Sequence, residues 1–462
     1  MRNFRYYAAG KERSVFPYLP HTEQDIADML REIGIKSIDE LFSDIPPDLL
    51  LTRSLNIASR RSEHEVTRIL SSLAETNRSG MVSFLGCGIY DHLIPSVVKH
   101  IISRSEFSTA YTPYQPEFSQ GLLQAIFEFQ SLICELTSLD VSNASLYDGH
   151  TAAVEAANIA VNSVRKSDTI LFSATLHPHT KQVLHTHFSG SGISLVEVKQ
   201  ENGAISLDDL KQKLTPTVAV LITQTPNFFG CLEDYTEITN MVHANGSLLA
   251  VSSNPLSLGM LRSQGEWGAD IGFGDTQVFG LHPTFGGPTV GYIAARQASL
   301  RKMPGRIVGQ SVDKDGKRAF LLTLQAREQH IKRERATSNI CSNQALAALA
   351  TTVHLAAVGK EGLKEAAAQN YQQAHYLYER LISELPIRPL YNQPFFNEFS
   401  LVLDKDPETV LAAMEKEGIL GGIALKAFYP DAFPNALIVA VTEKRTWEEL
   451  DQYVETLRRA IK

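Results

Sequence analysis

The residues with the clearest chemical potential follow apolar stretches in the middle of the chain. The segment Asp148-Gly149-His150 joins a short apolar stretch to an Ala-rich helix. Free backbone N–H groups and the positive end of a helix dipole meet at such a junction, which favours an anion site, although a tight turn at a helix start explains it equally well. Asn227 follows the apolar run 218–223, at the carboxyl end of an expected strand, where open α/β sheets bind ligands.

A second candidate is the segment 109–117, which is rich in tyrosine and proline. Proline fixes the backbone and tyrosine offers a ring face and a hydroxyl, so the segment suits a rigid loop that lines a pocket or contacts another subunit. A packed connector is the alternative.

Four histidines lie close together in the sequence, at positions 177, 179, 185 and 187. No Cys, Asp or Glu accompanies them, and Pro178 interrupts the local regularity. A catalytic zinc site normally includes a carboxylate or a third positioned ligand. We therefore expect no metal site, and interpret these histidines as polar surface residues or as residues satisfied within the protein.

Composition excludes several classes of function. With 462 residues, 44% hydrophobic and 20% charged, the chain is typical of a globular enzyme, and its net charge of -8 argues against nucleic acid or an anionic membrane as the main partner. The four cysteines are widely separated, so neither a disulfide scaffold nor a four-thiolate zinc site is expected. The N-terminus resembles no signal peptide and no stretch is long and apolar enough to span a membrane, which predicts a cytoplasmic protein.

The elements that must position these residues follow from the hydrophobic pattern. Residues 1–78 read as a helical segment, with helix starts at Thr22-x-x-Asp25 and Ser62-x-x-Glu65. Residues 79–325 alternate helices with short, nearly continuous apolar strands, a pattern that predicts a parallel sheet covered on both faces. Residues 326–462 predict a smaller α/β domain. Expected elements include the following: helix 120–137; strands 169–172, 193–198, 218–223 and 248–251; helices 340–358 and 361–384; strand 399–403; helix 407–417; strand 436–441; helix 447–461; and a charged, mobile turn at 313–317.

Several motifs resemble the glycine dehydrogenase (decarboxylating) family, the P-proteins of the glycine cleavage system, and in particular the alpha subunits of its two-subunit form. The resemblance covers nearly the whole chain. Its motifs are Phe84 to His92, Tyr111 to Glu117, Tyr147-Asp148-Gly149, Gln224 to Gly230, Phe285-Gly286-Gly287-Pro288 and Ala336 to Cys341. It implies the aspartate-aminotransferase-like fold of pyridoxal phosphate (PLP) enzymes, fold type I, with a large, mainly parallel-sheet domain and a smaller C-terminal α/β domain.

The resemblance also shows which parts of a PLP site are missing. Such an enzyme needs a Schiff-base lysine and an acid for the pyridinium nitrogen. Gln277, seven residues after Asp270, occupies the lysine position, and Ser252 occupies the position of the acid. An amide cannot form a Schiff base, so we expect no catalytic residue and no covalently bound cofactor in this chain.

The remaining phosphate loop departs from the family at one position. After Asp148-Gly149 the relatives usually carry a small residue, whereas this chain has His150. A ring at this point could narrow a vestigial phosphate site. The lysines 181, 199 and 302 do not lie at the expected strand end, and we interpret them as solvated surface charges.

The function implied is that of a non-catalytic alpha subunit. A PLP-bearing beta subunit decarboxylates glycine and passes the aminomethyl group to the lipoyl H-protein, while the alpha chain completes the wall of the active site. The family suggests an alpha2-beta2 heterotetramer. The candidate residues for this wall or for a subunit contact, by motif match, are Tyr111, Thr112, Tyr114, Gln115, Glu117 and Asn227.

Two alternatives remain open at this stage. The chain could be a self-sufficient PLP enzyme that uses another lysine, or a non-enzymatic binding protein on the same fold. Fold alone does not decide among the three, because function depends on sites.

Overall fold

The computed structural model describes residues 18, 20–51, 53, 55–108, 110–341 and 343–462. The expectations for the first 17 residues, including the absence of a signal peptide, and for Thr109 lie outside this described part. The chain forms two compact units, residues 1–79 and residues 80–462. Within the described residues, no helix combines the length and apolar character needed to cross a membrane.

The first unit contains the two helices that the capping motifs predict, α1 (Glu23–Ile33) and α2 (Glu63–Glu75). At the start of α1, the Thr22 hydroxyl accepts a hydrogen bond from the Asp25 N–H at 3.2 Å. The Asp25 carboxylate in turn accepts one from the Thr22 N–H at 2.7 Å. Ser62 and Glu65 form the same reciprocal pair at α2, so both predicted helix starts are confirmed.

The second unit is built on a seven-stranded sheet with the order β2-β10-β9-β8-β7-β3-β4. The strands are β2 (Val141–Ser142), β3 (Thr169–Ser173), β4 (Ser194–Val198), β7 (Val218–Gln224), β8 (Leu248–Ser252), β9 (Ile271–Asp275) and β10 (Gly291–Ala295). Strands β4, β3, β7, β8 and β9 run parallel, and β10 is antiparallel to both neighbours. The predicted α/β class with a mainly parallel sheet is confirmed.

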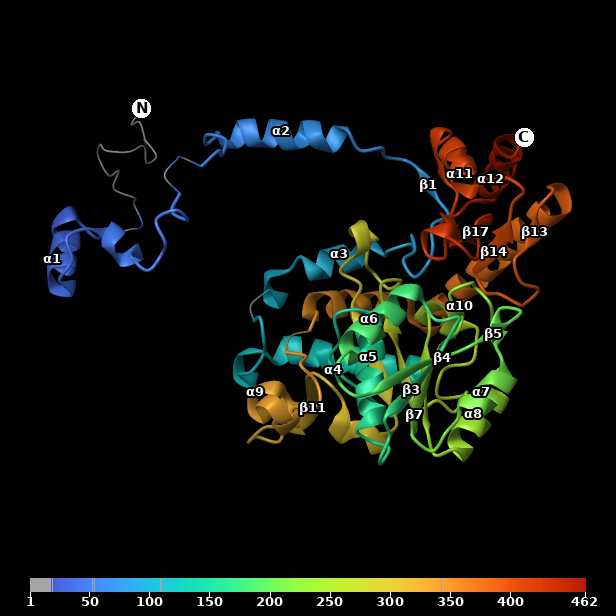
Figure 1. Cartoon of the computed structure of the whole chain (residues 1–462), viewed down its shortest axis with the longest axis horizontal. Helices are drawn as coiled ribbons and strands as arrows, with labels where there is room; N and C mark the ends of the chain where they lie inside the picture. The colour runs from blue at the N-terminus through green and yellow to red at the C-terminus, as the bar shows by residue number, and fades with distance from the viewer. Residues whose placement is uncertain (1–17, 19, 52, 54, 109, 342) are drawn as a thin grey trace. The chain divides into compact units, whose positions relative to one another are not determined.

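Helices cover both faces of this sheet, as the strand pattern requires. Figure 1 shows α5 and α6 beside strands β3 and β7, with α7 and α8 next to each other further along the sheet. The helices of this part are α3 (Ser96–Ile102), α4 (Gln120–Thr137), α5 (Gly149–Val161), α6 (Pro178–Phe188), α7 (Leu207–Lys213) and α8 (Thr236–Ala244). Neighbouring residues of β3 illustrate the two faces: Ile170 and Phe172 pack with α5, while Leu171 packs with residues of α7 and α8.

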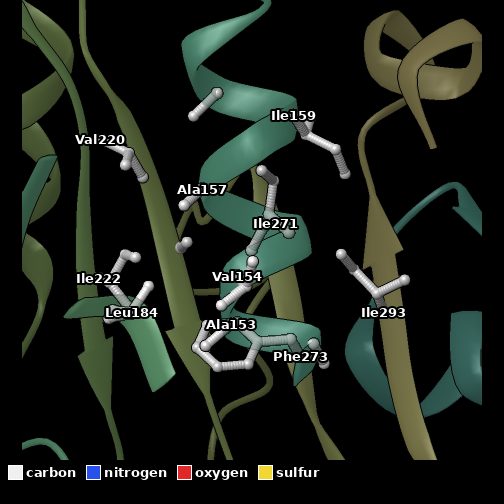
Figure 2. Close-up of a cluster of buried hydrophobic side chains, with 14 of the residues drawn as sticks. Ala153, Val154, Ala157, Ile159, Leu184, Val220, Ile222, Ile271, Phe273 and Ile293 are labelled. Atoms are coloured by element: carbon white, nitrogen blue, oxygen red, sulfur yellow. The ribbon is translucent and has the colours of Figure 1, made fainter. Parts of the chain in front are cut away.

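Small side chains allow α5 to lie close to the sheet. Ala153, Ala156 and Ala157 are fully buried, and Figure 2 shows Ala153 and Ala157 with Val154 above the strand residues Ile222 and Ile271. Interiors are packed nearly as densely as organic crystals, so the short methyl groups set the distance between helix and sheet. The same close packing fixes the position of Gly149 at the start of the helix.

A four-stranded antiparallel sheet with the order β13-β14-β17-β16 forms the core of the C-terminal part. Its elements and neighbours are α10 (Ala345–Glu384), β13 (Arg388–Pro389), β14 (Glu398–Val402), α11 (Pro407–Lys416), β16 (Ile423–Ala424), β17 (Ala436–Ala440) and α12 (Trp447–Ala460). The expected break between two long helices is the backbone of Gly359, which leaves the helical region at φ 60° and ψ −173° inside α10. The helix begins at residue 345 rather than 340. The boundary at residues 325 and 326 stays a prediction.

The sequence pattern missed strands β9 and β10 and the hairpin of β11 (Ile307–Val312) and β12 (Arg318–Thr323). Strand β9 contains two glycines and an aspartate among its five residues, so it lacks the run of branched residues that marks a buried strand. The predicted charged turn at 313–317 is the loop of this hairpin, where the Asp313 carboxylate accepts hydrogen bonds from the N–H groups of Asp315 and Lys317, both at 2.8 Å. The shorter elements are β1 (Val82–Ser83), β5 (Gln200–Glu201), β6 (Ala204–Ile205), α9 (Gln329–Lys332) and β15 (Ile419–Leu420).

The close contact between α5 and the sheet can be tested by overpacking. Ala157→Leu adds three carbons to a fully buried position, and we expect it to lower the free energy of unfolding by about 1–3 kcal/mol. Ala356→Leu, at an exposed position of α10, is the matched control and is expected to change it by less than about 0.5 kcal/mol. Urea unfolding followed by circular dichroism measures both, and equal effects of the two substitutions would contradict the packing argument.

Candidate functional site

A cavity lies at the carboxyl ends of β7, β8 and β9, in the position where open α/β sheets bind ligands. It contains about 660 Å³ of empty space, part of it open to solvent. Its lining includes Gly149, His150, His177, Ser252, Ser253, Asp275 and Glu398.

Gln277, at the lysine position of the resemblance, forms a fixed structural contact. It is 1% exposed and follows the end of β9 by two residues. Its amide oxygen accepts the Tyr90 N–H at 3.0 Å, and its amide nitrogen donates to the carbonyls of Tyr90 at 3.0 Å and Leu281 at 2.8 Å. A lysine has no acceptor for the Tyr90 N–H, so the amide suits this contact in a way that an amine does not.

The end of β8 brings hydroxyl groups to the cavity where the resemblance expects an acid. Ser252 and Ser253 both line the cavity. The Ser252 carbonyl accepts the Thr225 N–H at 2.9 Å, which holds the ends of β7 and β8 together. The hydroxyl oxygen of Ser253 is buried and has no hydrogen-bond partner among the described residues.

The start of α5 contacts the end of β9 closely. Asp148 caps the helix, because its carboxylate accepts the Thr151 N–H at 2.8 Å. A Cβ atom on Gly149 would lie 3.2 Å from the Asp275 nitrogen and 3.3 Å from its Oδ2, so the carboxylate of Asp275 stands beside the first turn of the helix. Burial and the nearby charge of Asp148 raise the pKa of Asp275 to about 7.

Three histidines meet beside the cavity, His150 from α5 and His177 and His179 at the start of α6. One nitrogen of each ring lies within 4.8 Å of the others. Contrary to the sequence interpretation, Pro178 does not disrupt the structure but occupies the first position of α6, which His177 caps, and His177 is buried.

The hydrogen bonds of His177 argue against metal binding by this cluster. Its Nδ1 accepts the His179 N–H at 3.1 Å, and its Nε2 lies 3.1 Å from the Cys87 carbonyl, to which it donates. Both ring nitrogens are therefore engaged. Burial lowers the pKa of His177 to about 3 and also lowers that of His150, whose Nδ1 lies 2.8 Å from the Thr180 hydroxyl. Both rings are neutral at pH 7.

Glu398 of β14 is a buried acid that the sequence reasoning missed. Its Oε1 accepts the Cys87 N–H at 2.6 Å and its Oε2 accepts the Tyr90 hydroxyl at 3.0 Å. A Cβ on Gly86 would lie 2.0 Å from Oε1, which explains the glycine. Burial raises the pKa of Glu398 to about 7. An acid inside the mostly apolar stretch 395–403 was the signal that could have identified it.

The residues predicted for a pocket wall or a subunit contact do not line this cavity. Tyr111 is 84% exposed, and Thr112, Gln115 and Glu117 lie in the same surface segment. The Tyr114 hydroxyl accepts a hydrogen bond from Arg306 at 3.2 Å, and the guanidinium lies 5.4 Å from the centre of its ring. Their role in a pocket wall or a subunit contact stays a prediction.

Asn227 lies beside the cavity residues Gln224 and Pro226 but faces another direction. Its amide nitrogen donates to the Gly203 carbonyl at 2.7 Å and to the Glu233 carboxylate at 2.9 Å. Its oxygen accepts the N–H groups of Phe229 and Cys231, both at 3.1 Å. With 1% exposure, the side chain organises the turn that follows β7.

Of the three lysines interpreted as surface charges, Lys199 is exposed as predicted, whereas Lys181 and Lys302 are partly buried. The Lys181 side chain is 14% exposed, and its Nζ donates to the Ala174 carbonyl at 2.7 Å and pairs with Glu197 at 2.9 Å. Lys302 donates to the Ser163 hydroxyl at 3.1 Å. Neither residue is among those that line the cavity.

Comparisons with known proteins agree on one family. The sequence-family model of the glycine cleavage system P-protein matches residues 17–457 of the chain. A protein of Carboxydothermus hydrogenoformans described as probable glycine dehydrogenase (decarboxylating) subunit 1 is 52% identical over 442 residues, covering 95% of this chain and 99% of the relative. A protein of the same description from Listeria monocytogenes is 49% identical over 445 residues, covering 96% and 99% of the two chains.

Solved structures support the same fold. A crystal structure of glycine decarboxylase (P-protein) of the glycine cleavage system, in inhibitor-bound form, superimposes with a TM-score of 0.86 at 40% identity, covering 96% of this chain and 100% of the other. The sphingosine-1-phosphate lyase of Burkholderia pseudomallei, with a TM-score of 0.63 and 14% identity over 90% of this chain and 94% of the other, shares the fold alone. The fold is that of PLP-dependent fold type I enzymes.

The contact between Gln277 and Tyr90 can be tested by deletion. Gln277→Ala leaves three buried backbone groups without partners, and we expect the free energy of unfolding to fall by about 2–4 kcal/mol. Gln297→Ala, at an exposed position, is the matched control, with an expected change below about 0.5 kcal/mol. Urea unfolding of both variants measures the difference. Similar unfolding midpoints for Gln277→Ala and Gln297→Ala would show that the Gln277 hydrogen bonds contribute little to stability.

Glu398 predicts a pH dependence of stability. Since its pKa rises from 4.5 to about 7 on folding, the folded state binds the proton more tightly, so this residue makes stability fall as the pH rises from about 4.5 to 7. Glu398→Gln removes this titration. We expect the free energy of unfolding of the variant, relative to that of the wild type, to increase by on the order of 1–3 kcal/mol from pH 5 to pH 8. Unfolding titrations at several pH values measure this.

The control for this titration is Glu361→Gln, which alters an exposed carboxylate of α10. Its difference from the wild type is expected to be the same at pH 5 and pH 8. A Glu398→Gln curve that runs parallel to the wild-type curve would contradict the raised pKa of Glu398.

Proposed function

The chain belongs to the glycine cleavage system P-protein family, and we propose that it acts in it as a non-catalytic alpha subunit. In this proposal a beta subunit of the same enzyme holds PLP, glycine loses its carboxyl group as carbon dioxide, and the aminomethyl group passes to the lipoyl H-protein. The observation that carries the proposal is that the chain has the fold of PLP-dependent fold type I enzymes, while Gln277, at the expected lysine position, is hydrogen-bonded to the backbone of Tyr90.

The cavity of this chain does not fit PLP. No described lysine lines it to form a Schiff base, and Ser252 provides no carboxylate for a pyridinium nitrogen. The start of α5, where a phosphate would bind, has the Asp275 carboxylate beside it instead of a cation. His150 further narrows the same corner, where its ring centre lies 4.8 Å from that of His177. These residues support a cofactor bound by the partner.

The partner surface in this proposal includes the segment around Tyr111. Most of its side chains are exposed. Its backbone is anchored by the buried Pro113, and the Arg306 guanidinium donates a hydrogen bond to the Tyr114 hydroxyl. Tyr111, Thr112, Tyr114, Gln115 and Glu117 would complete the wall of the beta subunit's active site, while Asn227 would act indirectly by holding the turn after β7. An alpha2-beta2 heterotetramer in the cytoplasm, with the H-protein as its substrate carrier, follows from the same proposal.

Reconstitution tests the proposal. We expect exchange of labelled bicarbonate into glycine, with H-protein present, only when this chain is mixed with a beta-type chain from the same organism, at a rate at least 100-fold above either chain alone. Exchange by this chain alone would contradict the proposal and favour a self-sufficient enzyme.

Borohydride reduction provides the matched control. After incubation with PLP and reduction, peptide mapping should find one lysine of the beta-type chain labelled stoichiometrically and no lysine of this chain.

Co-elution of the two chains in gel filtration tests the remaining alternative. If they do not co-elute, a binding protein without a catalytic partner becomes the better explanation.

A further inference from the structure

The first unit contains two amphipathic helices that the proposed function does not use. In both helices apolar side chains recur at positions i, i+3, i+4 and i+7, the spacing of a single helix face. They are Ile26, Met29, Leu30 and Ile33 in α1 and Val66, Ile69, Leu70 and Leu73 in α2. Each helix therefore presents one apolar face.

These apolar faces are exposed. None of the described residues from 18 to 79 is buried, and Leu70 and Leu73 of α2 are 60% and 59% exposed. Helices of 11 and 13 residues are only marginally stable in water by themselves. Further exposed apolar side chains lie between the two helices: Ile38, Leu41, Phe42, Ile45, Leu49, Leu50, Leu51, Leu55 and Ile57. So much exposed apolar surface indicates a segment that binds another molecule.

The charges of the same unit restrict what that molecule is. Residues 20–51 contain two basic residues, Arg31 and Lys36, and eight acidic ones, Glu23, Asp25, Asp28, Glu32, Asp39, Glu40, Asp44 and Asp48, which gives a formal net charge of −6. Amphipathic helices that lie on anionic membranes carry lysines and arginines on their polar face, so a membrane is disfavoured. A second copy of this chain has a net charge of −8 and is disfavoured as well. The complementary partner is a different protein whose apolar surface carries lysines and arginines.

We propose that residues 20–51 and 55–79, the N-terminal arm, bind the beta-type chain of the same enzyme. The apolar faces of α1 and α2 pack on that chain, and carboxylates of residues 20–51 pair with its lysines and arginines. A stable interface uses roughly 20–30 residues from each side, which the N-terminal arm can supply. The inference rests on the proposed function for the identity of the partner, and it adds a contact surface to the segment around Tyr111.

Two matched substitutions in the full-length chain test the apolar face of α2. Leu70→Asp places a charge on that face, and we expect it to weaken binding to the beta-type chain from the same organism at least tenfold. Ser71→Asp adds the same charge on the exposed, opposite side of the helix and is expected to leave the affinity unchanged. Analytical ultracentrifugation of the mixtures measures both affinities, and equal values for the two variants would overturn the inference. Because Leu70 is already 60% exposed, neither substitution is expected to change the melting temperature of the isolated chain.

Charge reversal tests the acidic residues of the N-terminal arm. Asp39→Lys changes an exposed residue of the short helix Ile38–Phe42, and we expect it to weaken binding severalfold and to reduce the dependence of the affinity on sodium chloride. Glu361→Lys, at an exposed position of α10, is the matched control and should do neither. A wild-type affinity that does not fall between about 50 and 500 mM sodium chloride would overturn the proposed charge pairing.

Limited digestion with trypsin tests whether the N-terminal arm is covered only in the complex. We expect trypsin to cut the isolated chain after the exposed residues Lys36 and Arg68, and to cut there at least tenfold more slowly once the beta-type chain is added. Protection of both sites in the isolated, monomeric chain would overturn the inference, because the apolar faces are then covered without a partner.

Two further results would assign the N-terminal arm to another occupant and overturn the inference. One is self-association of the isolated chain that Leu70→Asp abolishes, and the other is binding of the isolated chain to vesicles of phosphatidylcholine and phosphatidylglycerol that Leu70→Asp abolishes. The proposed function fails separately: a mixture that associates through the N-terminal arm but exchanges no bicarbonate into glycine contradicts that function alone. A mixture that exchanges bicarbonate, and in which Leu70→Asp binds as tightly as the wild type, contradicts this inference alone.

Discussion

The hydrogen bonds between the Gln277 side chain and the Tyr90 backbone organise the whole candidate site. They join the end of the large sheet to the segment 86–90, which the Glu398 carboxylate holds from the smaller sheet. Three parts of the chain that are distant in sequence therefore meet at one loop. Because each contact is buried and uses a strong donor or acceptor, the loop has little freedom, and it shapes one wall of the cavity.

The same contacts occupy the position at which the resemblance expects a Schiff-base lysine. A lysine at position 277 would have to point into the cavity to form a Schiff base. The amide of Gln277 instead donates hydrogen bonds to backbone carbonyls. At the start of α5 an acid, Asp275, stands where a phosphate would need positive charge. The cavity lies at the strand ends, its wall carries the carboxyl groups of Asp275 and Glu398, and neither lysine nor arginine is among its described lining residues.

Much of the fold could be predicted from the sequence, because its signals are local. The buried strands β3, β7 and β8 are short branched runs, and the capping pairs at Thr22 and Ser62 mark helix starts directly. Strand β9 was missed because its glycines and Asp275 lack that signature. His177 is one of the internally satisfied histidines that the sequence interpretation allowed, whereas Pro178 begins a helix instead of interrupting the local structure.

The sequence by itself determined the α/β class, the mainly parallel sheet and, through its motifs, the family. It also has Gln277 and Ser252 where the resemblance expects a lysine and an acid. Only the tertiary structure decided what these two residues contact. The partners of Gln277 and the approach of Glu398 to Cys87 and Tyr90 depend on contacts between residues far apart in the chain. Local pattern carries no information on such contacts, because burial and hydrogen bonding are fixed only when the sheets and helices pack.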